Sequence, residues 1–330
     1  MKKILLILTG GTIGSCENNG IISAAQTDCR VLEMYRNKFP ADGIEFVTEK
    51  PYNILSEDLF VGNWEKLIRF IINSDLSGFD GIIITHGSDT LSYSSAMLGL
   101  CLNNIGLPVV ITASDYVPDD KRSNALINFK ACVDLILQSE NGVYTVYKNK
   151  TDKYARIFIP TRLCEADRIN DVFTSCDDLP PVYINEKGMI SGDLLSDDTK
   201  HDMMPGLSDI DFRKSVLLVH PYPSLEYKSI TIPENAGAVL HITYHSGTVS
   251  EKALFLLERC RERGIPMFLC SLKSSNNSIY ETSDILLKNG AIPVFDTGNE
   301  SAYAKLLLAV NLYPDDIAGF MRKNIYHEII

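Results

Sequence analysis

The sequence predicts a two-domain α/β protein in which the larger, N-terminal domain holds a mostly parallel sheet. Three observations indicate this fold class. The chain has 330 residues, which is enough for two domains of ordinary size. Short apolar runs rich in β-branched residues alternate with longer segments whose apolar residues recur at helical spacing, as in sheets covered by helices on both faces. This alternation stops in one polar stretch and then resumes, which predicts a second, smaller α/β domain.

The first domain is expected to span residues 1–185 and contains the longer series of elements. Ser56 is a candidate N-cap for its first long helix, because a serine hydroxyl can accept a hydrogen bond from the first turn. Strands are predicted at residues 4–8, 44–48, 81–85, 107–112 and 143–147, and helices at 63–72, 90–104 and 123–137.

The start of the chain resembles a signal peptide, because two lysines precede an apolar run. This run ends at Thr9, before it reaches the ~7–15 apolar residues and the cleavage site of such a peptide. No stretch of the chain approaches the ~18 apolar residues of a membrane span. We therefore interpret the run as a buried strand and expect a cytoplasmic protein.

A polar stretch at residues 186–213, rich in Gly, Asp and Ser, is predicted to connect the two domains. Residues 214–330 then form the predicted smaller α/β domain. Its strands are expected at residues 215–220, 238–243, 266–270 and 292–295, and its helices at 251–263 and 301–312.

Composition narrows the classes of partner. The net charge of −11 argues against nucleic acid and against an anionic membrane, since both require a basic surface. The eight cysteines form no C-x-x-C pair, and none has a metal-ligand spacing with a nearby histidine. We expect them to be buried thiols in a reducing compartment, with no metal site.

Hydroxyl-bearing and acidic side chains follow the strands of the first domain where each strand ends. Residues 9–15 read TGGTIGS after the first strand, residues 85–90 read THGSDT, and residues 113–115 read ASD. A further polar loop covers residues 53–58. Because ligands bind outside the carboxyl ends of the strands in open α/β sheets, we expect these four loops to converge on one site.

Two other chemistries fit parts of these loops. Glycines after a first strand often hold a dinucleotide phosphate, but the spacing here is G-G-x-x-G and no P-loop sequence is present. The same glycines allow close approach to a small substrate and can offer N–H groups to an oxyanion. A triad of Ser88, His86 and Asp89 is disfavoured, because neighbours in a tight loop do not readily meet in triad geometry. We expect His86 to be structural, while Ser88 and Asp89 could instead cap a helix.

Two loop sequences resemble the signatures of a known enzyme family. Residues 9–14, TGGTIG, resemble the T-G-G-T-I signature of bacterial L-asparaginases, and residues 85–91, THGSDTL, resemble their H-G-T-D-T-[ML] signature. The resemblance continues through residues 56–58, Trp64 and residues 108–114, and it covers most of the chain. Within the family, the chain is most similar to the cytoplasmic type I enzymes.

This resemblance implies a flavodoxin-like larger domain, no metal or organic cofactor, and homodimers or homotetramers. It also implies hydrolysis of L-asparagine to L-aspartate and ammonia. Thr12 would attack the carboxamide carbon and form an acyl-enzyme, with Ser88 and Asp89 beside it and loop N–H groups at the oxyanion. Ser56 would bind the substrate carboxylate, and Glu57 with Asp89 the ammonium. The residues implied in substrate binding are Gly11, Ser56, Glu57, Gly87 and Ser114.

Four positions depart from the family pattern. Ser88 stands where the family has Thr, and Ile21 stands where it has a Tyr that contacts the nucleophile. The family has a Lys after the strand at 143–147, but the matching region here follows an insertion, reads TRLCEAD at residues 161–167 and contains no Lys. Arg162 is the nearest basic residue, Lys153 lies further off, and arginine stays protonated and cannot act as a base. The family's S-D-G-x-x-N becomes SNALIN.

These departures leave three functions open. The first is an amidohydrolase acting on asparagine. The second is a catalytically weakened homologue that binds an amino acid as a sensor or partner subunit. The third is an amidase of the same fold for another small amide, such as a modified amino acid or the glutamine of a transamidation complex. A general base contributes ~10²–10⁴-fold to a rate, so loss of the family's Tyr and Lys could leave a weak enzyme. The residues implied in binding are present, and ligand binding is therefore predicted more securely than turnover.

Overall fold

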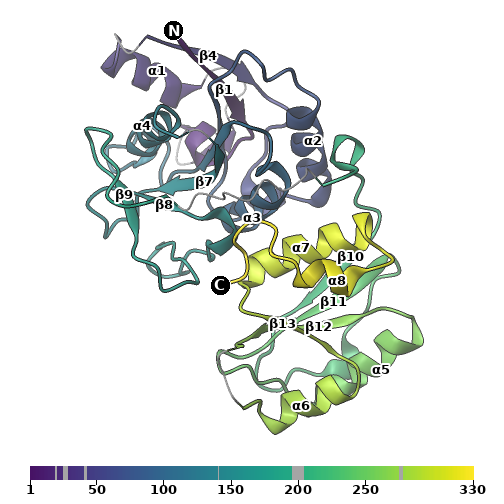
Figure 1. Cartoon of the computed structure of the whole chain (residues 1–330). Coiled ribbons are helices and arrows are strands. Elements are labelled where there is room, and N and C mark those ends of the chain that lie inside the picture. Colours follow the sequence, from purple (N-terminus) through teal and green to yellow (C-terminus); the bar gives the residue numbers. More distant parts are fainter. Residues whose placement is uncertain (19–20, 25–28, 41–42, 140, 195–203, 275–277) are drawn as a thin grey trace. The chain divides into compact units, whose positions relative to one another are not determined.

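Figure 1 shows the computed structural model of the chain, which divides into two units, Met1–Ile210 and Asp211–Ile330. The structure describes residues 1–18, 21–24, 29–40, 43–139, 141–194, 204–274 and 278–330. The division between the units falls inside the stretch that the sequence predicts as a connection. Of the helices described, none combines the length and the apolar character needed to cross a membrane.

The larger unit is built on a seven-stranded sheet in the order β4-β1-β5-β6-β7-β8-β9. Its parallel part has the strand order of flavodoxin-like folds, which confirms the predicted fold class. The parallel strands are β4 (Ile44–Glu49), β1 (Lys2–Leu8), β5 (Gly81–Thr85), β6 (Pro108–Thr112) and β7 (Gly142–Tyr147). Two short strands that the sequence did not predict, β8 (Ala155–Phe158) and β9 (Val182–Ile184), extend the sheet in antiparallel pairing.

Helices cover both faces of this sheet (Figure 1). On one face, α1 (Arg30–Lys38) and α4 (Ala125–Ile136) share a core cluster with strand residues such as Ile4. On the other face lie α2 (Val61–Ile72) and α3 (Leu91–Leu102).

The beginning of α2 corrects one prediction. Ser56 does not cap this helix but lies in a 3-10 turn, Ser56–Asp58, just before it. The helix begins after Phe60, whose backbone N–H donates to Asn63 Oδ1 at 3.1 Å. The hydrogen bond at this helix end therefore runs from the preceding backbone N–H to an amide oxygen of the first turn, and Ser56 takes no part in it.

Strand register aligns the carboxyl ends of four neighbouring strands at one edge of the sheet. Leu8 of β1 pairs with Thr85 of β5, Thr85 pairs with Thr112 of β6, and Thr112 pairs with Val146 of β7. The loops that leave these strands therefore start at one level. In this strand order the topological switch point lies between β1 and β5, where ligands bind in such folds.

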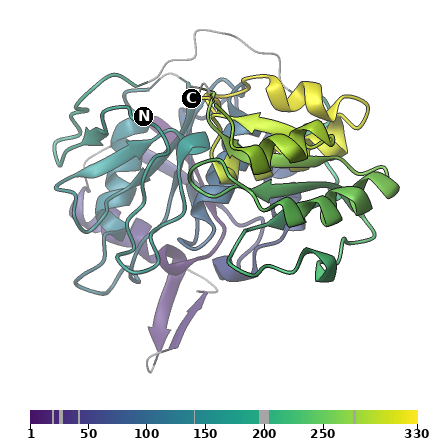
Figure 2. The same ribbon diagram turned by 90° about the horizontal axis from the view of Figure 1, so that it is seen from below.

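A hairpin of β2 (Ser15–Asn18) and β3 (Ile21–Ala24) follows the first loop and is drawn in purple in Figure 2. Only the backbone of this hairpin is described beyond Ser15. The side chain of Ile21, which stands where the family has a tyrosine, lies outside the described part of the structure.

The smaller unit contains four parallel strands in the order β10-β11-β12-β13. They are β10 (Ser215–Val219), β11 (Ala236–Ile242), β12 (Met267–Leu272) and β13 (Ile292–Phe295). One face carries α5 (Leu254–Glu262) and α6 (Glu281–Lys288), and the other carries α7 (Asn299–Leu312) with α8 (Ile317–Arg322) beside it (Figure 1). The predicted strands and two predicted helices of this unit are confirmed, whereas α6 and α8 were not predicted.

Candidate active site

The loop after β1 and the loop after β5 touch at two glycines. A Cβ atom placed on Gly11 would lie 2.3 Å from the Gly87 Cα, and Gly11 has a φ of +71° that glycine adopts readily. A Cβ atom on Gly87 would lie 2.3 Å from the Ser56 Oγ. Thr12 and Ser88 each follow one of these glycines, so both predicted hydroxyls lie next to the same junction.

Backbone hydrogen bonds hold the first loop in place. The Gly11 N–H donates to the Ile54 carbonyl at 2.9 Å, and the Ile54 N–H donates to the Thr9 carbonyl at 3.1 Å. The Thr9 hydroxyl donates to the Thr85 carbonyl at 2.8 Å. The loop is thereby attached on one side to residues 53–58 and on the other to β5, as the predicted convergence requires.

Thr12 opens a short 3-10 turn, Thr12–Gly14, and is half-buried. The turn is closed by the Gly14 N–H and by the Ser15 hydroxyl, which both donate to the Gly11 carbonyl, at 3.1 and 2.7 Å. Within the described part of the chain the Thr12 hydroxyl makes no hydrogen bond. A threonine held on a rigid turn with an uncommitted hydroxyl suits the role of a nucleophile.

Ser56 and Asp89 are directly bonded. The Ser56 hydroxyl donates to Asp89 Oδ2 at 2.8 Å and accepts from the Asp89 N–H at 3.3 Å. The Thr90 hydroxyl also donates to the Ser56 carbonyl at 3.1 Å. These bonds orient the Asp89 carboxylate. For Ser56 to donate to a substrate carboxylate, the role that the resemblance implies, its hydroxyl must rotate away from Asp89.

His86 has a structural role, as predicted. Its ring is buried, Nδ1 donates to the Gly87 carbonyl at 2.8 Å, and its backbone N–H donates to the Thr112 carbonyl at 2.8 Å. Burial lowers the pKa of His86, so the ring is neutral at physiological pH. It links the start of the loop after β5 to the end of β6, and its Nδ1 bonds the Gly87 carbonyl rather than Ser88 or Asp89.

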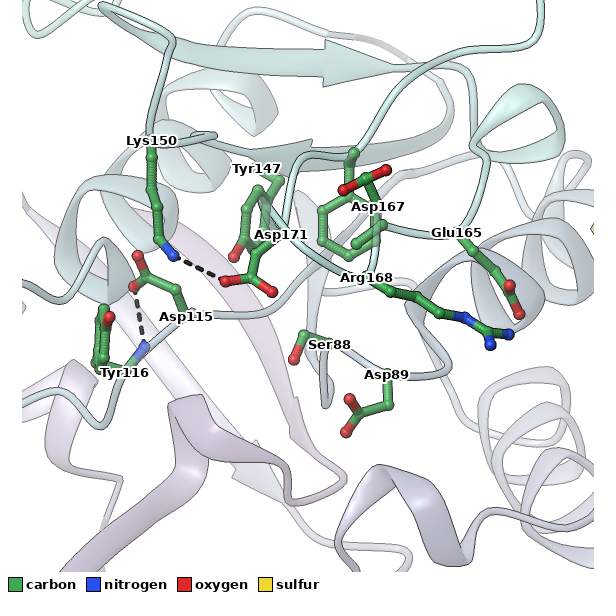
Figure 3. Close-up of a pocket in the computed structure, with 12 residues that line it drawn as sticks. Ser88, Asp89, Asp115, Tyr116, Tyr147, Lys150, Glu165, Asp167, Arg168 and Asp171 are labelled. Atoms are coloured by element: carbon green, nitrogen blue, oxygen red, sulfur yellow. Dashed lines mark hydrogen bonds and ion pairs between the residues drawn. The ribbon is translucent and has the colours of Figure 1, made fainter.

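A cavity of about 510 Å³ opens beside Ser88 and Asp89. Figure 3 shows its lining side chains, which come mainly from the loops after β6 and β7 and from residues 165–173. Five carboxylates and two cations line it, so the cavity is net negative and favours a ligand with a cationic amine. The charged lining residues are Asp89, Asp115, Glu165, Asp167, Asp171, Lys150 and Arg168.

Lys150 is one of several cavity residues that sequence reasoning missed. Its Nζ lies 2.8 Å from Asp171 Oδ2, the ion pair drawn in Figure 3. The hydrogen bond to Asp171 raises the pKa of Lys150, so the ammonium stays protonated near neutral pH and does not act as a base. The only signal for Lys150 in the sequence was its position just after a strand that ends at the site.

The two basic residues considered from the sequence do not line this cavity. Arg162 lies in a buried 3-10 turn, Pro160–Arg162, and its Nη1 is 3.4 Å from Asp177 Oδ2. Lys153 lines a different cavity. The expectation that Arg162 is the basic residue nearest the site is therefore corrected, because Lys150 and Arg168 line the cavity and Arg162 does not.

Three other predicted residues are not part of the cavity lining. Ser114 is fully buried, and its hydroxyl donates to the Tyr116 carbonyl at 2.8 Å. Glu57 is exposed in the turn that also holds Ser56. Thr12 is likewise absent from the cavity lining, although the adjacent Gly11 touches the loop that carries Ser88.

Two asparagines at α4 explain part of the altered S-N-A-L-I-N segment. Asn128 Nδ2 donates to the Ala113 carbonyl at 2.9 Å, and Asn128 Oδ1 accepts from the Lys148 N–H at 2.9 Å. Asn124 exchanges hydrogen bonds with Asp115 and donates to the Lys148 carbonyl at 2.8 Å. The loops after β6 and β7 are thus fixed to one another.

Across the described residues, no group of three or more His, Cys, Asp or Glu side chains is arranged to hold a metal ion.

Comparison with known proteins supports a family relationship. The family model described as "Asparaginase, N-terminal" matches residues 3–177. One subunit of the glutamyl-tRNA(Gln) amidotransferase of Aeropyrum pernix is 27% identical, over 99% of this chain and 79% of the relative. L-asparaginase of Thermococcus kodakarensis is 26% identical, over 99% of both chains.

Solved structures have the same fold. The thermostable L-asparaginase of Thermococcus kodakarensis superposes with a TM-score of 0.79 at 23% identity, over 99% of both chains. L-asparaginase I of Vibrio cholerae gives a TM-score of 0.75, also at 23% identity, over 100% of this chain and 99% of the other. The two relatives compared by sequence are archaeal, so the comparisons do not single out the bacterial type I enzymes.

Proposed function

The chain belongs to the asparaginase family, and from this premise we propose that it hydrolyses the side-chain amide of L-asparagine to give L-aspartate and ammonia. The observation that carries the proposal is the contact between Gly11 and Gly87 at the switch point of the sheet. This contact supports a site at which Thr12, whose hydroxyl has no partner among the described residues, adjoins Ser88 and Asp89 beside a cavity.

The proposed reaction proceeds in two steps. The Thr12 oxygen attacks the carboxamide carbon, and the proton of the Thr12 hydroxyl passes to the amide nitrogen. Ammonia then departs, and an aspartyl ester remains on Thr12. Water then attacks the ester, aspartate leaves, and the hydroxyl is restored. Backbone N–H groups of the glycine loops stabilise the oxyanion in both steps. Asp89, oriented by Ser56, accepts the substrate ammonium, which the acidic lining of the cavity also attracts.

The substrate is tested by measuring ammonia release from L-asparagine, L-glutamine and a panel of small amides. Asp89→Asn is expected to lower kcat/KM for asparagine by about 10–100-fold, because a charge-assisted contact to the ammonium is lost. Asp58→Asn removes an exposed carboxylate from the turn that holds Ser56 and serves as the matched control, with little change expected. Equal effects of both changes would contradict the role of Asp89.

A second function, ligand binding with weak turnover, is favoured by the state of the two basic residues. Lys150 has a raised pKa, and the buried Arg162 is paired with Asp177, so neither supplies a base at the cavity. This function predicts that aspartate raises the melting temperature while ammonia release from every amide of the panel stays far below enzymatic rates. Ammonia release from any amide at enzymatic rates would rule it out.

The relative named as part of a glutamyl-tRNA(Gln) amidotransferase suggests a third function, release of ammonia from glutamine within a larger complex. A preference for glutamine over asparagine in the same panel would favour it. Self-association as a homodimer or homotetramer and a cytoplasmic location are also part of the proposal. Sedimentation of the purified chain checks the first of these, and fractionation of cells checks the second.

A further inference from the structure

A second cavity, of about 410 Å³, lies in the larger unit and shares no lining residue with the first. It is lined by the end of α1, one side of α4, and the two antiparallel strands β8 and β9. In Figure 1 these two strands extend the sheet beside α4, which covers the same face of the sheet as α1. The cavity lies where the sheet continues past this helix, and nothing in the proposed reaction uses it.

The charge of this cavity is opposite to that of the whole chain. Four lysines and two carboxylates line it, whereas the chain carries a net charge of −11. Lys130 is neutralised by Asp134, with Nζ and Oδ2 2.5 Å apart. Lys38 and Lys148 have no carboxylate within ion-pair distance in the described residues. The cavity therefore has positive charge available for an anionic group.

Lys148 is held in place by its backbone. Its N–H donates to Asn128 Oδ1 at 2.9 Å, and its carbonyl accepts from Asn124 Nδ2 at 2.8 Å. The residue is half-buried, and it belongs to the lining of this cavity. The position of this residue at the cavity is therefore fixed by hydrogen bonds to two residues of the α4 region.

Apolar groups line the rest of the cavity. Phe39, Leu126 and Ile184 belong to this lining, and each also packs against the hydrophobic core of the larger unit. The Lys130 ammonium lies 5.3 Å from the centroid of the Phe39 ring, so the apolar and cationic parts adjoin. A ligand that fits both parts needs an apolar body and a negatively charged end.

We propose that this cavity binds a small organic anion, with its carboxylate at Lys148 and Lys38 and its aliphatic or aromatic body against Phe39, Leu126 and Ile184. The volume lies within the range of small-molecule sites, about 300–1,000 Å³. The site is independent of the proposed reaction, and its test does not use enzymatic activity.

The test is isothermal titration calorimetry of the purified full chain with two carboxylates, phenylbutyrate and indoleacetate. The matched alcohols, phenylbutanol and tryptophol, have similar bodies without the charge. The acids are expected to bind with a Kd below about 1 mM, and the alcohols about tenfold more weakly or worse. Acids that do not bind in this range, or alcohols that bind equally well, overturn the proposal.

Substitutions locate the site. Lys148→Gln and Lys38→Gln are each expected to weaken binding of the acids by about tenfold, while Lys66→Gln, on the exposed side of α2, leaves it unchanged. Ala131→Leu fills the cavity from α4 and is expected to abolish binding of acid and alcohol alike. Circular dichroism identifies variants that are folded. Folded Lys148→Gln and Lys38→Gln proteins that bind as well as Lys66→Gln overturn the assignment.

Discussion

Substitution of Gly11 by alanine tests whether the contact between the two loops organises the site. Gly11 has φ +71° and ψ 178°, a region of the backbone map that is almost restricted to glycine and costs other residues about 1–3 kcal/mol. The added Cβ would also lie 2.3 Å from the Gly87 Cα, where ordinary contact begins at 3.4 Å. The loops would have to separate by about 1 Å, and a misplacement of this size can cost about 10²-fold in rate.

Gly43→Ala is the matched control. Gly43 has a similar φ of +68°, but a Cβ there meets no atom within 4 Å. Its substitution is expected to cost about 1–2 kcal/mol of stability, with activity unchanged. Gly11→Ala is expected to cost more than Gly43→Ala in urea unfolding and to reduce ammonia release about 10²-fold. Equal activity of the two folded variants would refute the inference that the glycine contact positions Thr12 and Ser88.

Two further predictions concern buried groups of the smaller unit. Lys305 and Glu328 form a fully buried ion pair at 2.6 Å. Lys305→Met leaves the Glu328 carboxylate buried without its partner and is expected to lower the free energy of unfolding in urea by about 3–5 kcal/mol. A loss below about 1 kcal/mol would contradict this reasoning. Burial lowers the pKa of His241 to about 4, and its Nε2 accepts from the Tyr227 hydroxyl at 2.9 Å. The His241 ring is therefore protonated below pH ~6.5 in the unfolded chain but only near pH 4 in the folded chain. The free energy of unfolding contributed by His241 is thus intact above pH ~6.5, falls by about 3 kcal/mol as the pH drops to 4, and then levels off. Urea unfolding at pH 7 and at pH 5 should show that stability decreases less between these pH values in His241→Gln than in the wild type. Equal decreases in the two proteins would contradict the assignment.

The elements that sequence reasoning predicted are those with strong local patterns. β5 and β6 are fully buried runs of β-branched residues, and such runs are visible without a structure. The missed elements are short or mixed in polarity. β9 has three residues, and α1 buries only Val31, Leu32 and Tyr35 among charged neighbours. Tertiary packing, which a single sequence does not display, decides such segments.

The site was predictable where one loop carried its own signature. The sequences around Thr12 and Asp89 placed two hydroxyl-rich turns at the ends of neighbouring strands, and the parallel sheet brings those ends together. The pairing of Ser56 with Asp89, and the entry of Lys150 into the cavity, depend on contacts between loops. No local pattern encodes such contacts, and alignment of residues 161–167 with the family pattern pointed to Arg162 instead.

The most direct test of the account is mass spectrometry of the protein from a quenched reaction with asparagine, or with whichever amide of the panel is turned over. The account predicts a covalent acyl adduct on the peptide that contains Thr12, and it predicts that Thr12→Ala yields neither adduct nor ammonia. An adduct on a different residue, or ammonia release that continues in the Thr12→Ala protein, would contradict it.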